Sequence, residues 1–96
     1  MNLKDLLKTK KEEIIRIASK HGACNIRIFG SVAKGLSNKD SDIDFLVDTT
    51  SNLSSWFPAG LIIDLENLLH IKVDIATPRA LKERIKKKVL QEAIPL

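Results

Sequence analysis

Hydrophobic and polar residues follow two different periods along this chain, and each period is typical of one kind of secondary structure. Apolar residues recur three and four positions apart in long segments, a spacing that places them on one face of a helix. This spacing predicts helices over residues 3–21, 59–69 and 78–93. Shorter segments rich in β-forming residues, two of them with apolar residues in alternate positions, predict strands over residues 25–29, 42–47 and 71–76.

Turn and capping residues separate these predicted elements. Gly22 follows the first helix, where a left-handed backbone conformation commonly ends a helix. Ser31 is expected to cap a short helical stretch that reaches about residue 36, and residues 37–41 form a polar loop. Thr77 and Pro78 resemble an N-cap followed by proline in the first turn of the last helix.

The order of the predicted elements defines the fold class. Helix, strand, turn, strand, helix, strand and helix follow one another, which predicts an α/β fold with a short mixed sheet covered by helices. A chain of 96 residues has the usual length of one domain with one hydrophobic core. We therefore expect residues 1–96 to form a single small domain.

Composition excludes several classes of protein. No apolar run approaches the roughly 20 residues that cross a bilayer, and the first residues lack a signal-peptide pattern, so we expect a cytoplasmic protein. One cysteine, Cys24, and two histidines supply neither an internal disulfide nor a zinc site, and we expect Cys24 to be a small core residue. A net charge of +4 favours polyanionic partners without requiring them.

Acidic residues in the predicted strands are the first candidate site. Asp42 and Asp44 alternate with apolar residues, so they share one strand face about 6.6 to 7 Å apart at Cα. Asp74 has the same kind of position in a later strand and would complete the cluster if the two strands were neighbours. Three close carboxylates repel one another, and oxygen ligands favour Mg²⁺ or Mn²⁺. The alternative is that Asp42 and Asp44 form the solvated face of an edge strand.

A glycine-rich turn before this strand is the second candidate site. The segment Gly30-Ser31-Val32-Ala33-Lys34-Gly35 supplies a hydroxyl group and backbone N–H groups where a strand meets a short helix, which is typical of an anion site. A phosphate-loop NTPase would need a Gly-Lys-Ser or Gly-Lys-Thr ending, and this chain has Gly35-Leu36-Ser37. An ordinary tight turn is the alternative.

The two features together resemble a known family. Gly30-Ser31, Asp42-Ile43-Asp44 and Asp74, in this order and spacing, are similar to the motifs of minimal nucleotidyltransferases of the DNA polymerase beta superfamily. The resemblance implies that Gly30 and Ser31 hold the nucleotide and that the three aspartates bind two Mg²⁺ ions. Val32 departs from the family pattern, because many members carry arginine after the serine.

The resemblance also implies an activity and a partner. Members of this kind transfer AMP from ATP to a hydroxyl group, often a tyrosine, of a helical HEPN-domain toxin, and so act as its antitoxin. An antitoxin that neutralises the toxin by binding alone is the alternative. Direct nucleic-acid binding through the basic last helix is disfavoured, because it leaves Asp42, Asp44 and Asp74 unexplained. We expect Trp56 to be buried against the second helix.

Overall fold

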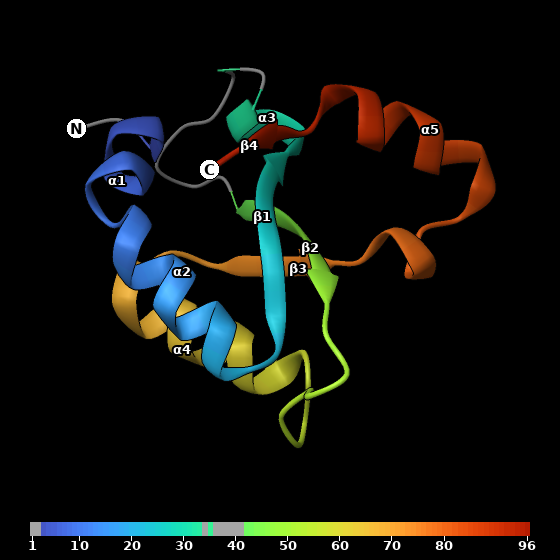
Figure 1. The fold of residues 1–96 in the computed structure, drawn as a ribbon. Coiled ribbons are helices and arrows are strands. Elements are labelled where there is room, and N and C mark those ends of the chain that lie inside the picture. The colour runs from blue at the N-terminus through green and yellow to red at the C-terminus, as the bar shows by residue number, and fades with distance from the viewer. Residues whose placement is uncertain (1–2, 34, 36–41) are drawn as a thin grey trace.

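The computed structural model describes residues 3–33, 35 and 42–96 of the chain. Its helices and strands, in chain order, are α1 (Leu3–Thr9), α2 (Lys11–Lys20), β1 (Ala23–Phe29), α3 (Gly30–Ala33), β2 (Ile43–Thr49), α4 (Ala59–Leu69), β3 (Val73–Ala76), the 3₁₀ helix η1 (Pro78–Ala80), α5 (Glu83–Glu92) and β4 (Ile94–Pro95). Figure 1 shows these elements along the chain.

The strands form one mixed sheet in the order β3-β2-β1-β4. β1 is antiparallel to both β2 and β4, and β2 is parallel to β3. The helix α4 connects the two parallel strands, as a crossover between parallel neighbours requires. The predicted α/β fold with a short mixed sheet is therefore confirmed.

One face of the sheet holds the hydrophobic core. Ile43, Phe45 and Val47 alternate along β2 and are all buried in the main core cluster. The helices α1, α2 and α4 lie together on this side (Figure 1), and their core residues are Leu3, Leu7, Ile14, Ala18, Leu61, Leu65 and Leu69. The predicted alternation of β2 thus places its intervening residues on the opposite face.

The first predicted helix, over residues 3–21, is in fact two helices. A turn at Lys10 separates α1 from α2. The buried positions explain why a break is tolerated there: after Leu7 the next buried residue is Ile14, so no core contact is lost between them. Gly22 has a φ of +85°, consistent with the predicted end of the helix.

The other predicted boundaries are correct in part. α4 spans residues 59–69 as predicted, and β1, β2 and β3 differ from the expected strands by one or two residues at their ends. The helix predicted from Ser31 to about residue 36 already ends at Ala33. The polar loop predicted over residues 37–41 lies outside the described residues.

The last predicted helix, over residues 78–93, is interrupted. Pro78 opens the short η1, and the next two residues, Leu81 and Lys82, are extended before α5 begins. Thr77 precedes η1 but makes no side-chain cap hydrogen bond among the described residues. The chain then adds a fourth strand, β4, which the sequence did not predict, because a two-residue strand containing proline carries little sequence signal.

Two side chains contradict their predicted burial. Trp56 is 85% exposed, and Cys24 is exposed as well. Neither residue therefore belongs to the core. None of the described helices is long and apolar enough to cross a membrane.

Candidate functional site

Two aspartates from neighbouring strands lie side by side in the sheet. The parallel pairing of β2 with β3 makes Asp44 and Asp74 direct partners, one register position after Ile43 and Val73. Adjacent strands are about 4.8 Å apart, and paired residues project to the same face. The structure therefore places Asp44 beside Asp74, which the sequence predicted only if their two strands were neighbours.

These carboxylates lie on the face away from the core. Ile43 and Val73, the residues before them, are both buried in the core cluster, so Asp44 and Asp74 project to the other side of the sheet. Asp42 directly precedes β2 and is exposed. Since β2 lies between β3 and β1, the alternative of a solvated edge strand is wrong.

The electrostatics of Asp44 reflect this grouping. Partial burial raises the pKa of the Asp44 carboxyl above its ordinary value of 3.8, and the negative charges of Asp74 and Asp42 raise it further, in that order of importance. Both neighbouring carboxylates therefore act on Asp44. Within the described ranges, however, no group of three or more His, Cys, Asp or Glu residues is placed to hold a metal ion by itself.

The glycine turn reaches the same place from β1. Phe29, the last residue of β1, pairs with Asp44, so Gly30 follows directly beside the carboxylate. Gly30 has a φ of +74°, and a Cβ atom on it would lie 2.5 Å from the Asp44 Oδ2 atom. The backbone conformation thus favours glycine, and any side chain here would displace the Asp44 carboxylate. Ser31 is the second residue of α3, and its side chain is outside the described part of the chain.

The departure at Val32 has a structural explanation. Val32 is fully buried and belongs to the main core cluster. The side chain at this position therefore packs with the core and is not presented at the surface beside the aspartates. An arginine here would have to bury its charge or leave the position that valine occupies.

Asp48, the other acidic residue of β2, has a different role from Asp44. Asp48 lies four positions after Asp44, on the same face of β2. Arg27 Nη2 donates to Asp48 Oδ1 at 2.6 Å, and Asn25 Nδ2 donates to Asp48 Oδ2 at 2.9 Å. Arg27 and Asn25 of β1 thus bind the Asp48 carboxylate. The Asp44 carboxylate, in contrast, lies beside the like charge of Asp74.

A histidine bridge at the far end of α2 was missed by sequence reasoning. His21 Nδ1 lies 2.7 Å from Ser54 Oγ, and His21 Nε2 lies 2.7 Å from Asp64 Oδ2. The bridge joins the end of α2 to α4 and to the loop before it. No local motif links the three residues, because 33 and 43 positions separate His21 from its two partners.

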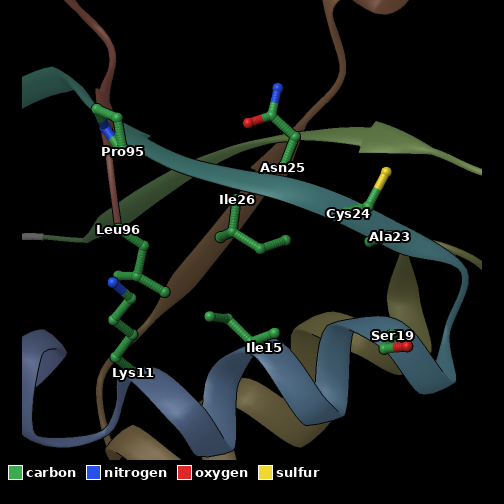
Figure 2. Close-up of a pocket in the computed structure, with 9 residues that line it drawn as sticks. All are labelled: Lys11, Ile15, Ser19, Ala23, Cys24, Asn25, Ile26, Pro95 and Leu96. Carbon is green, nitrogen blue, oxygen red and sulfur yellow. The ribbon is translucent and has the colours of Figure 1, made fainter.

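An apolar groove lies between α2, β1 and the C-terminal residues. Its volume is about 350 Å³, and its lining residues are Lys11, Ile15, Ser19, Ala23, Cys24, Asn25, Ile26, Pro95 and Leu96. Figure 2 shows Ile15, Ile26 and Leu96 facing one another across it, while Cys24 and Asn25 point away. The lining of the groove has no acidic side chain and one basic one, so its chemistry does not suit a metal-bound triphosphate.

The geometry defines the class of protein. A glycine turn leading into a helix, placed against paired carboxylates on adjacent strands, suits a nucleotide with its metal ions, because the turn offers N–H groups and the carboxylates offer oxygen ligands. A model of the nucleotidyltransferase domain matches residues 8–96. The chain belongs to this nucleotidyltransferase family.

Similar proteins agree with this assignment. A protein of Methanocaldococcus jannaschii, assigned by inference as a protein adenylyltransferase, is 34% identical over 94 residues, which cover 98% of this chain and 97% of that protein. The protein adenylyltransferase MntA of Thermococcus cleftensis is 34% identical over 92 residues, which cover 96% of this chain and 90% of MntA.

Solved structures show the same fold. One described as a minimal nucleotidyltransferase superposes with a TM-score of 0.85 at 41% identity and covers 100% of this chain and 97% of that one. A crystal structure of a toxin-antitoxin with AMP-PNP superposes with a TM-score of 0.74 at 23% identity, over 88% of this chain and 70% of that one. At that identity the second likeness supports the fold alone.

Proposed function

We propose that residues 1–96 form one protein adenylyltransferase domain that moves AMP from ATP to a hydroxyl group of a partner protein. The observation that carries the proposal is the register of Asp44 against Asp74, with Gly30 closed against the same carboxylate. The protein adenylyltransferases among the relatives support the choice of acceptor class and of nucleotide.

The donor set fits Mg²⁺. Asp42, Asp44 and Asp74 supply only oxygen atoms. Partial burial, and then the charges of Asp74 and Asp42, raise the pKa of Asp44, so a cation beside this carboxylate would be favourable. The described carboxylates do not form a complete metal cage, so the nucleotide phosphates must provide further oxygens. Two bound Mg²⁺ ions would neutralise the phosphate charge and lower the pKa of the acceptor hydroxyl.

The residues of the chain position the reactants and accept a proton. Gly30 and Ser31 hold the phosphates at the start of α3, where the backbone N–H groups are available. The acceptor oxygen forms a bond to the α-phosphorus, the bond from this phosphorus to the bridging oxygen breaks, and pyrophosphate leaves. Asp74 is exposed and takes the proton of the acceptor hydroxyl.

The proposed acceptor is a tyrosine of a HEPN-domain toxin, and the modification makes this chain its antitoxin. The protein adenylyltransferases among the relatives support a protein as the acceptor. The described sheet and its helices offer little additional surface to enclose an acceptor. We therefore propose that the partner brings its own binding surface and forms a hetero-complex. The cytoplasmic location expected from the sequence stays a prediction.

The experiment is co-expression with a HEPN-domain protein encoded beside this gene, followed by intact mass measurement of the partner. We expect one or more additions of about 329 Da, the mass of AMP joined through a phosphodiester, when ATP and Mg²⁺ are supplied. Asp44→Asn should remove the addition. A stable complex whose partner keeps its mass would support the alternative, an antitoxin that acts by binding alone.

A further inference from the structure

Glu66 of α4 binds both ends of the turn that leads into β3. Only residues 70–72 separate the end of α4 from Val73, the first residue of β3. The main-chain oxygen of Glu66 accepts the N–H of His70 at 2.8 Å, and its side-chain Oε2 accepts the N–H of Val73 at 2.9 Å. Glu66 thus connects the end of the helix to the beginning of the strand.

The turn and the strand after it need this support. His70 has a φ of +57°, a left-handed conformation that a residue with a Cβ atom adopts at an energetic cost. β3 lies at the edge of the described sheet, with β2 as its neighbour. Val73 is buried, so its N–H group would be costly without a partner, and Glu66 supplies this partner from a helix.

The same turn joins β3 to β2 just before the two aspartates of the site. Ile43 donates its N–H to the main-chain oxygen of Lys72, the last residue of the turn, at 2.9 Å. Ile43 and Val73 are register partners, and Asp44 and Asp74 directly follow them. The position of the turn therefore sets where the two aspartates lie relative to each other.

The Asp74 carboxylate follows the backbone of β3. Its Oδ1 atom accepts the N–H of Ile75 at 3.1 Å, so one carboxylate oxygen is bound to the strand itself. A displacement of β3 would consequently move this carboxylate relative to Asp44, although its charge would remain. A shift of about 1 Å in a reacting group can lower a rate about a hundredfold.

We propose that Glu66 is a positioning residue of the nucleotidyltransferase site and that its hydrogen bond to Val73 sets the register of Asp74 against Asp44. The inference rests on the proposed function, because that function assigns the proton of the acceptor hydroxyl to Asp74. It goes further by giving a role in this step to a residue of α4, a helix on the opposite side of the sheet, without contact to the reactants.

The test compares Glu66→Ala with Glu66→Gln, since alanine removes the acceptor oxygen, whereas glutamine keeps an oxygen and removes only the charge. In AMP transfer to the HEPN-domain protein proposed above, Glu66→Ala should lower kcat about tenfold. The KM for ATP should stay within about twofold, because the charge of Asp74 remains beside Asp44. Glu66→Gln should keep kcat within about threefold. Equal losses in both variants, or an unchanged kcat in Glu66→Ala, would overturn the inference.

His21→Ala is the control for stability. It removes the bridge between α2 and α4 and leaves the turn between α4 and β3 intact. We expect it to keep the kcat of the unchanged chain. A loss of kcat equal to that of Glu66→Ala, at a similar midpoint of thermal unfolding, would show that reduced stability suffices and would overturn the positioning role.

Amide hydrogen exchange of the ligand-free chain tests the register without a transfer assay. In Glu66→Ala the N–H groups of both Val73 and Ile43 should exchange at least about tenfold faster than in the unchanged chain, whereas Glu66→Gln and His21→Ala should leave both rates unaltered. Faster exchange at Val73 alone would make Glu66 a local cap and overturn the inference. If both amides respond but the unchanged chain transfers no AMP, the positioning of Asp74 stands and the proposed function fails.

Discussion

The carboxylate of Asp44 occupies the space that a Cβ atom on Gly30 would need, with its Oδ2 atom 2.5 Å from that position. Gly30 directly follows β1, and Asp44 lies in the neighbouring strand β2, so the glycine turn and the metal-binding candidate depend on each other. A side chain on residue 30 would have to displace the carboxylate that the proposed reaction needs.

Gly30→Ala should therefore reduce AMP transfer at least a hundredfold, because a displaced Asp44 is no longer oriented toward the nucleotide. Strain from a φ of +74° should also lower the free energy of unfolding by about 1 kcal/mol. Transfer assays and urea unfolding measure the two effects.

Gly35→Ala is the matched control for this prediction. Gly35 has a similar φ of +72°, but no atom of the described residues lies within 4 Å of a Cβ atom placed there. We expect a comparable loss of stability with transfer largely retained. If both alanine variants lose transfer equally, backbone strain alone explains the effect and the contact with Asp44 is irrelevant.

Asp44→Asn should raise the stability of the ligand-free protein at neutral pH. Burial and the two neighbouring carboxylates raise the pKa of Asp44 above 3.8, so the native state binds this proton more tightly than the unfolded chain does. The resulting contribution is present at low pH and is lost as pH rises through the native pKa. The advantage of Asp44→Asn should thus shrink as pH falls toward 3.8 and below.

Urea unfolding across this pH range measures the difference. A variant that is less stable than the unchanged chain at pH 7, or a difference independent of pH, would show that burial and the charges of Asp74 and Asp42 do not raise the pKa of Asp44 in the free protein.

Asp74→Asn and Asp48→Asn should differ in their effect on AMP transfer. Asp74 is the direct partner of Asp44, and its loss should abolish transfer without unfolding the protein. Asp48 is bound by Arg27 and Asn25, so Asp48→Asn should keep most of the transfer activity while costing about 0.5 kcal/mol, a figure reduced because Asp48 is partly exposed. Loss of transfer in Asp48→Asn, at unchanged nucleotide binding, would mean that the site extends farther along β2.

His21→Ala tests whether the histidine bridge is structural. Both ring nitrogens of His21 make short contacts, to Ser54 and to Asp64, and the bridge lies at the end of α2 remote from Gly30. We expect a loss of about 1 to 2 kcal/mol in unfolding free energy with AMP transfer unchanged. Hydrogen exchange should increase in the loop around Ser54. Reduced transfer at full folding would give the bridge a functional role instead.

Much of the site could be predicted, because strand periodicity shows which residues share one face of a strand. Alternation alone separates Ile43 and Phe45 from Asp42 and Asp44, and the structure confirms that the apolar pair enters the core. The sequence could not establish that β3 lies beside β2, because strand order depends on long-range packing. Once that order is known, the register of Asp44 with Asp74 completes the site.

The errors in the fold have equally local causes. The break at Lys10 costs no core contact, so the helical period continues across it undisturbed. The strand β4 is too short to give a pattern. We expected Trp56 to be buried, but it is exposed. The local sequence pattern does not indicate the conformation of the loop that exposes it.

Titration of the protein with ATP in a calorimeter is the most direct test of the central claim, that Asp44 and Asp74 bind a nucleotide through divalent metal. We predict ATP binding that requires Mg²⁺, that is lost with a chelator, and that is weakened at least tenfold in Asp74→Asn, because the carboxylates have no favourable contact with bare phosphates. Equal ATP affinity with Mg²⁺ and with chelator would contradict the metal site and, with it, the proposed mechanism.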